Sequence, residues 1–140
     1  MENSSKALGY LSLARKGGLA ELGEEPVGAI ARAGKAYVIL VASDASDHTW
    51  RRAKSYVAGT EQQCVRLDVT KDEMGFAVGR TSLAIAAIAD VQLALALVKA
   101  LPPKPETAQV LEVLTGKAAK AKKRQAEARA HQRNLKKGKK

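Results

Sequence analysis

The chain has 140 residues, 24 Lys and Arg against 14 Asp and Glu, and a net charge of +10, which allows one domain with an appendage. Its single cysteine excludes an internal disulfide and is typical of a reducing compartment. We expect neither a signal peptide nor a membrane span, because Asp90, Gln92 and Lys99 interrupt the longest apolar stretch, residues 83–101. A cytoplasmic, monomeric protein is therefore predicted.

The positive charge is concentrated in the last part of the chain. Residues 117–140 hold eleven Lys or Arg and one acid, Glu127, whereas residues 1–116 hold 13 basic and 13 acidic residues. The stretch lacks an apolar stripe, so we predict that it is disordered or a frayed helix when free. Polyanion binding is its expected use. The cations of this electrostatic tail are Lys117, Lys120, Lys122, Lys123, Arg124, Arg129, Arg133, Lys136, Lys137, Lys139 and Lys140.

A first helix is predicted to begin at a cap on Ser4 or Ser5, because apolar residues recur at helical spacing as far as Ala14. The glycines at 17–18 end it. Residues 19–22 form a short link or strand that leads into the next helix.

The second helix and the strand after it have the clearest sequence signals. Gly23 can serve as the N-cap, and Glu24 and Glu25 place negative charge beside the unpaired N–H groups of the first turn. Gly34 can end the helix in the left-handed conformation. The continuous apolar run 37–42 then predicts a strand covered on both faces, in the middle of a sheet flanked by helices.

A third helix is predicted from a cap at Ser46 or Asp47 to about Val57. Residues 64–69 alternate apolar and charged side chains, which indicates a strand with one wetter face.

The next stretch predicts a short helix, a strand and a longer helix. Thr70 and Glu73 have the spacing of a capping box, which starts a helix that ends at Gly79. Residues 83–88 form another apolar strand, and Asp90 can cap the last helix of the core.

This alternation of elements predicts an α/β fold, a three-layer α-β-α sandwich around a small mixed sheet. We assign residues 1–101 to this domain. Residues 102–116 form a Pro-containing linker with a possible short helix at 107–114, and residues 117–140 are the basic tail.

Three motifs in one unbroken order suggest a family. They are G-E-E-x-V-x-x-I-x-R-x-G-K-A, V-I-L-V-A-S-D-A-S and T-K-D-E-M-G-F-A-V-G-R. Together, over roughly residues 6–101, the chain resembles a bacterial YlxQ-type member of the ribosomal protein seven-Ae / thirty-e superfamily. The resemblance implies the sandwich fold and non-enzymatic binding of kink-turn-like or ribosomal RNA, without a cofactor.

The resemblance also implies where RNA binds: the N-terminus of the second helix and the loop after the fourth. Glycine permits close backbone approach, and free helix N–H groups are donors to phosphates. Where kink-turn binders usually carry a polar pair and a lysine, this sequence has Glu25, Pro26 and Ala29. The implied residues are Gly23, Glu24 and Glu25 in the helix, and Gly79, Arg80, Thr81, Ser82 and Leu83 in the loop.

Several alternatives stay open on the sequence alone. The stretch Gly23–Glu25 is either an RNA-facing edge or a well-capped helix start, and Lys35 is either a solvated turn residue or a phosphate contact. His48 and His131 have no partners at metal spacing, and Cys64 reads as a small core residue, so neither catalysis nor a metal site is predicted. The competing functions are a ribosome-associated protein-interaction adaptor and an accessory substrate-binding domain for an RNA-modifying enzyme.

Overall fold

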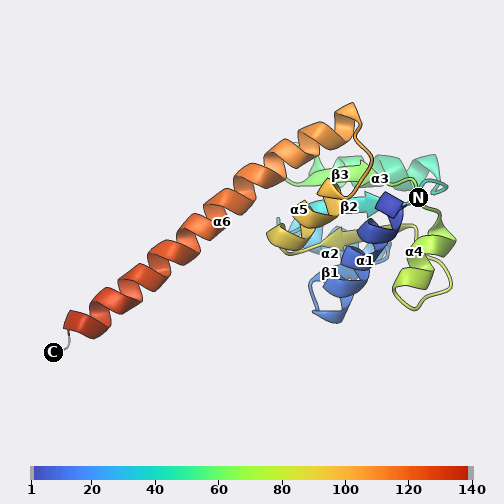
Figure 1. Ribbon diagram of the computed structural model, residues 1–140. Coiled ribbons are helices and arrows are strands. Elements are labelled where there is room, and N and C mark those ends of the chain that lie inside the picture. The colour runs from blue at the N-terminus through green and yellow to red at the C-terminus, as the bar shows by residue number, and fades with distance from the viewer. Residues whose placement is uncertain (1, 139–140) are drawn as a thin grey trace.

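The computed structural model describes the backbone of residues 2–138 and the side chains of residues 5–132. Helices and strands alternate along this part of the chain, and a long final helix projects from the compact body (Figure 1). In chain order the elements are α1 Glu2–Lys16, β1 Ala20–Leu22, α2 Glu24–Arg32, β2 Val38–Val41, α3 Asp47–Val57, β3 Gln63–Arg66, α4 Lys71–Ala77, β4 Ile85–Ile88, α5 Val91–Lys99 and α6 Pro105–Gly138.

The strands form one mixed sheet in the order β1-β4-β2-β3. Strand β2 runs parallel to β3, with Val38 opposite Gln63, and antiparallel to β4, with Val38 opposite Ile88. Helices α1 and α5 pack together on one face, and α2 and α3 pack together on the other (Figure 1). The predicted three-layer α/β sandwich around a small mixed sheet is therefore confirmed.

The central strand is the one that the apolar run predicted. All four residues of β2 are buried, and the strand lies between β4 and β3. Burial on both faces explains why its sequence shows no polar alternation.

Local signals also start three helices where they were predicted. The Ser46 hydroxyl accepts the Thr49 N–H, and the Asp90 carboxylate accepts the Leu93 N–H. Thr70 and Glu73 form the predicted capping box. These bonds satisfy N–H groups that have no partner within their own helix.

Other boundaries differ from those predicted. Helix α1 begins at Glu2, before the predicted cap, and β3 and β4 are shorter than the runs 64–69 and 83–88. Leu83 lies outside β4 because its N–H donates to the Lys71 carbonyl in α4 at 3.0 Å and not to a neighbouring strand. An apolar run therefore marks burial more reliably than it marks sheet pairing.

The C-terminal region differs most. Where a linker, a short helix and a tail that is disordered or a frayed helix were expected, one helix, α6, runs from Pro105 to Gly138. Val110, Leu114 and Ala118 are buried and, being four residues apart, share the face of α6 that meets the sandwich. The abundant Ala, Lys, Arg and Gln farther along are good helix formers, so the helix has no reason to stop at Leu114.

Candidate nucleic-acid interface

The N-terminus of α2 and the loop after α4 meet at one edge of the sandwich. Gly23 has a φ of 96° and donates its N–H to the Ile85 carbonyl at 3.0 Å, which ties it to the start of β4. A Cβ atom at Gly23 would lie 3.9 Å from Nη1 of Arg80. The Arg80 guanidinium thus reaches the residue that caps α2, and two segments far apart in sequence converge.

The loop that carries Arg80 is held closely against α4. The Arg80 N–H donates to the Gly75 carbonyl at 2.8 Å, and Gly79 adopts a φ of 75°. A Cβ atom on Gly75 would come within 2.7 Å of the Ser82 backbone nitrogen, so only glycine allows this approach. The position of Arg80 therefore depends on backbone packing.

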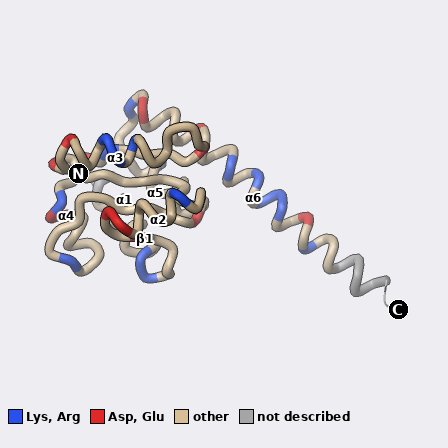
Figure 2. The backbone as a smooth tube through the Cα atoms, turned by 180° about the vertical axis from the view of Figure 1, so that it is seen from behind, with Lys and Arg blue, Asp and Glu red and all other residues tan. Residues whose placement is uncertain are grey.

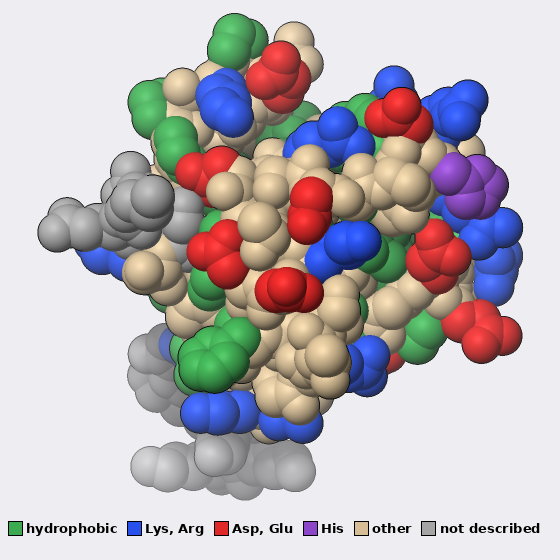
Figure 3. Space-filling view, turned by 90° about the vertical axis from the view of Figure 1, so that its right-hand side faces the viewer, with side chains coloured by type: hydrophobic (Ala, Val, Ile, Leu, Met, Phe, Trp, Pro, Cys, Tyr) green, Lys and Arg blue, Asp and Glu red, His purple; other side chains and the backbone are tan. Residues whose placement is uncertain are grey.

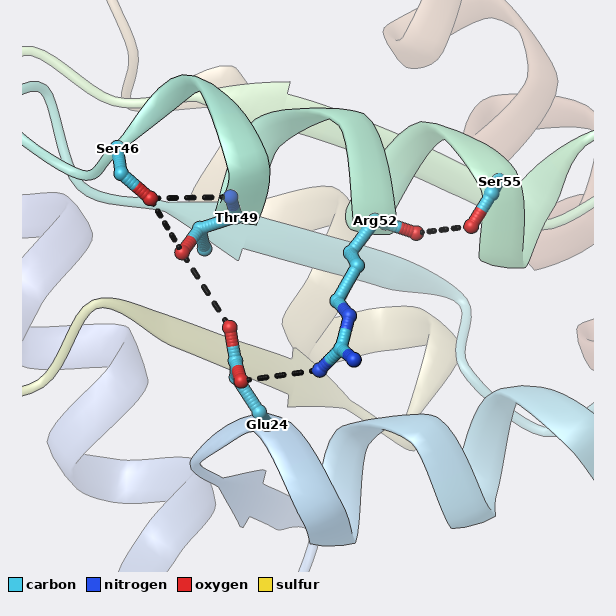
Figure 4. Close-up of polar contacts among 5 residues, drawn as sticks. All are labelled: Glu24, Ser46, Thr49, Arg52 and Ser55. Atoms are coloured by element: carbon cyan, nitrogen blue, oxygen red, sulfur yellow. Dashed lines mark hydrogen bonds and ion pairs between the residues drawn. The ribbon is translucent and has the colours of Figure 1, made fainter.

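Glu24 faces the neighbouring helix α3 (Figure 4). Its Oε2 lies 3.2 Å from Nη1 of Arg52, and its Oε1 accepts a hydrogen bond from the Thr49 hydroxyl at 3.3 Å. Both charged side chains are nearly half exposed, 48% for Arg52 and 42% for Glu24. Arg52 and Thr49 were not predicted as part of this edge, because no local sequence pattern reports a contact between two helices.

An open hollow of about 700 Å³ extends from this contact between α2 and α3. Charged groups of both signs surround it, so neither sign dominates. Its lining residues are Glu24, Glu25, Gly28, Arg32, Arg52, Ser55 and Tyr56. Figure 3 looks onto the end of the molecule that carries α4, where acidic and basic side chains are likewise interspersed.

The remaining predicted residues divide into two groups. Gly79, Arg80, Thr81 and Ser82 are exposed in the loop, and Glu25 is exposed beside Gly23. Leu83 is only 3% exposed and belongs to the core, so its side chain does not face this edge. Burial of an apolar residue next to a polar loop is the simplest reason for that difference.

Lys35 lies at the other end of the molecule. It follows the C-terminal end of α2, where it borders a hollow together with Tyr37, Glu61 and Lys117. Gly23, in contrast, bonds to Ile85, which pairs with Val41 at the far end of β2. The fold therefore does not bring Lys35 to the Gly23–Arg80 edge.

The start of the basic tail is attached to the sandwich. Nζ of Lys117 lies 2.6 Å from Oε2 of Glu61, and the hydrogen bond and positive charge of Lys117 lower the pKa of Glu61. Ala118 is buried. The predicted boundary at residue 117 thus falls within a packed segment of α6.

Lys120, Lys122 and Arg124 still border the sandwich, and beyond them α6 projects away from it (Figure 2). The exposed cations of α6 among the described side chains are Lys120, Lys122, Lys123, Arg124 and Arg129. The side chains of the other predicted tail cations lie outside the described residues; these are Arg133, Lys136, Lys137, Lys139 and Lys140.

The described residues contain no group of three or more His, Cys, Asp or Glu side chains that could hold a metal ion. Among the helices of the same residues, none combines the length and apolar character needed to cross a membrane.

The fold and this edge define a class of α-β-α sandwich proteins, and comparisons with solved structures support the assignment. A Bacillus halodurans protein of unknown function matches with a TM-score of 0.63 and 21% identity over 68% of this chain and 95% of that chain. The Giardia lamblia 15.5kD RNA binding protein matches with a TM-score of 0.53 and 16% identity over 84% of this chain and 88% of that one. No protein-family model and no curated protein matches the sequence. The chain is therefore similar in fold to these two proteins.

Proposed function

We propose that this chain is a non-enzymatic RNA-binding protein of the YlxQ type that recognises structured RNA, kink-turn-like or ribosomal, through the Gly23–Arg80 edge. The observation that carries the proposal is the approach of the Arg80 guanidinium to Gly23. The likeness in fold to a 15.5kD RNA binding protein supports it.

The chemistry of the edge suits a bent phosphate backbone. Gly23 has no side chain, so a phosphate can approach the first N–H groups of α2, which are natural anion donors. The Arg80 guanidinium presents several N–H donors in one plane, which matches two oxygens of a phosphate. One phosphate can thus be held by backbone and side chain together.

The carboxylates at the same edge favour recognition of the shape of an RNA over attraction to its phosphate charge. The charge of Glu24 is partly offset by Arg52 at 3.2 Å, whereas Glu25 is exposed beside it. A carboxylate repels phosphate but accepts hydrogen bonds from base amino groups. An RNA with an unstacked base at this point satisfies the edge better than a regular duplex does.

The exposed cations of α6 supply affinity without sequence preference in this proposal. Their contribution comes from released counterions, so it declines steeply as salt rises. The sandwich then contributes the preference for RNA shape, and α6 contributes much of the binding affinity.

The test is equilibrium binding of the full chain to a kink-turn RNA, a regular duplex of equal length and a single strand, each across a salt series. We expect the kink-turn RNA to bind most tightly, with a preference that persists as salt rises. Equal affinity for all three RNAs at every salt concentration would overturn the proposed shape recognition. RNA-independent capture of a ribosomal protein would instead favour the adaptor function.

A further inference from the structure

One large apolar side chain near the edge contributes nothing to the core. Phe76, the only phenylalanine of the chain, is 88% exposed. Among the described residues the other large hydrophobic side chain that stands out in this way is Leu13, which is 55% exposed in α1. A phenyl ring held in water loses the burial energy that other large apolar residues of the fold gain.

Phe76 lies within one turn of the Arg80 loop. It occupies the last turn of α4, and its carbonyl accepts the Gly79 N–H at 3.3 Å. The preceding residue, Gly75, accepts the Arg80 N–H at 2.8 Å. The ring and the guanidinium are therefore carried by one closely bonded turn.

This turn is rigidly supported. The first turn of α4 has its capping box, and the Lys71 N–H donates to the Asp44 carboxylate at 2.8 Å. On the other side Gly75 packs against the backbone of Ser82. Such a support fixes the backbone that carries the ring, so little backbone order must be gained when a ligand binds.

We propose that Phe76 is a stacking platform for an unpaired nucleobase of the RNA held at the Gly23–Arg80 edge. This inference rests on the proposed function. A flat apolar ring and a cation that are carried by the same turn suit a nucleotide, which joins a flat base to a phosphate. The class of ligand is thereby narrowed to RNA with at least one base free of its helix.

The test uses the full chain and a kink-turn RNA that carries 2-aminopurine at one internal-loop position at a time. We expect Phe76→Ala to weaken binding about 5- to 150-fold, because loss of one base–aromatic stack has that effect. Stacking also quenches 2-aminopurine, so at one position the quenching seen on binding the native chain should be lost in Phe76→Ala. Phe76→Tyr should keep both properties.

Leu13→Ala is the matched control, since it removes another exposed apolar side chain, which lies in α1. It should leave affinity and fluorescence unchanged. If Phe76→Ala binds and quenches like the native chain while the native chain still prefers kink-turn RNA, the stacking role is overturned and the proposed function stands. If the native chain has no such preference, both are overturned. Circular dichroism of each variant confirms folding.

Discussion

The Glu24 carboxylate bonds to the Arg52 guanidinium at 3.2 Å, so that a residue of α2 expected to face RNA is bonded to α3 (Figure 4). The same carboxylate accepts the Thr49 hydroxyl, whose oxygen lies 3.1 Å from that of Ser46, the N-cap of α3. A row of polar contacts through Glu24, Thr49 and Ser46 thus links the N-terminal ends of α2 and α3. The contact also offsets part of the negative charge beside Gly23.

Removing Arg52 should affect RNA binding more than stability. Because both partners are nearly half exposed, we expect Arg52→Ala to lower the free energy of unfolding by less than about 1 kcal/mol. RNA affinity should fall further in Arg52→Ala than in Arg51→Ala, because of these two residues Arg52 is the one that offsets the negative charge of Glu24. By the same reasoning, Glu24→Lys should tighten binding to plain duplex RNA. Filter binding and urea denaturation measure the two effects, and equal losses in Arg51→Ala and Arg52→Ala would contradict the electrostatic role of the pair.

Arg80→Ala should reduce selectivity for bent RNA. Hydrogen bonds to a charged group contribute about 1.5–3 kcal/mol, so affinity for the kink-turn RNA should drop about tenfold or more while duplex binding changes little. The control is Arg15→Ala, which removes an exposed cation from the last turn of α1. A parallel loss of kink-turn and duplex binding in Arg80→Ala would mean that this residue acts as a general cation.

A methyl group at Gly75 should destabilise the fold and displace the Arg80 loop. The added Cβ would lie 2.7 Å from the Ser82 nitrogen, and overpacking of this kind costs about 1–3 kcal/mol. Gly116→Ala is the matched control, because a Cβ there meets nothing within 4 Å. Within α6 that change should stabilise the helix by about 0.5–1 kcal/mol. Denaturant unfolding distinguishes the two, and a Gly75→Ala chain as stable as the native one would refute the packing argument.

Neutralising the cations of α6 should flatten the salt dependence of RNA binding. Each lost phosphate contact lowers the log–log slope by about 0.7–0.9, so four substitutions by Gln should lower it by about 3. Gln is a good helix former, so the helix is retained. A variant that loses four cations from the sandwich should keep most of the slope. The tail positions are Lys122, Lys123, Arg124 and Arg129, and the control positions are Lys6, Arg15, Lys16 and Lys99.

The Lys117–Glu61 pair predicts a specific dependence on pH. The hydrogen bond and charge of Lys117 hold the pKa of Glu61 below its ordinary value of 4.5. A lowered pKa in the folded state stabilises the fold above the ordinary value, and this contribution disappears as pH falls through the folded pKa. In Lys117→Gln the pKa of Glu61, measured by carboxyl NMR titration, should return toward 4.5. Lys120→Gln should shift the pKa of Glu61 less. An unchanged Glu61 titration in Lys117→Gln would show that the pair does not persist in solution.

The structural features that the sequence predicted correctly depend on residues that lie close together along the chain. The glycine at 23, the Thr70–Glu73 box and the buried strand were predicted correctly, because backbone conformation and capping are local properties. The meeting of Gly23 with the Arg80 loop was implied by the family resemblance and not by spacing alone. The fold brings Gly23 and the Arg80 loop close together, and no single sequence motif indicates this.

What the sequence could not predict depends on contacts across the fold. Gln62 is one example: it is buried, accepts the Ala36 N–H at 2.9 Å and donates to the Ala31 carbonyl at 3.1 Å, which closes the end of α2. A glutamine between polar residues gives no local sign of such a role. The docking of α6 had a signal in Val110 and Leu114, but the Pro-rich segment before them obscured it.

The direction of α6 has a consequence for the size of the ligand. At 1.5 Å per residue the helix carries Arg129 about 18 Å along its axis from Lys117, which itself lies at the end of the sandwich away from Gly23. An RNA that engages both the Gly23–Arg80 edge and the far part of α6 must therefore follow the body of the protein, or else the protein joins two separate strands as a clamp.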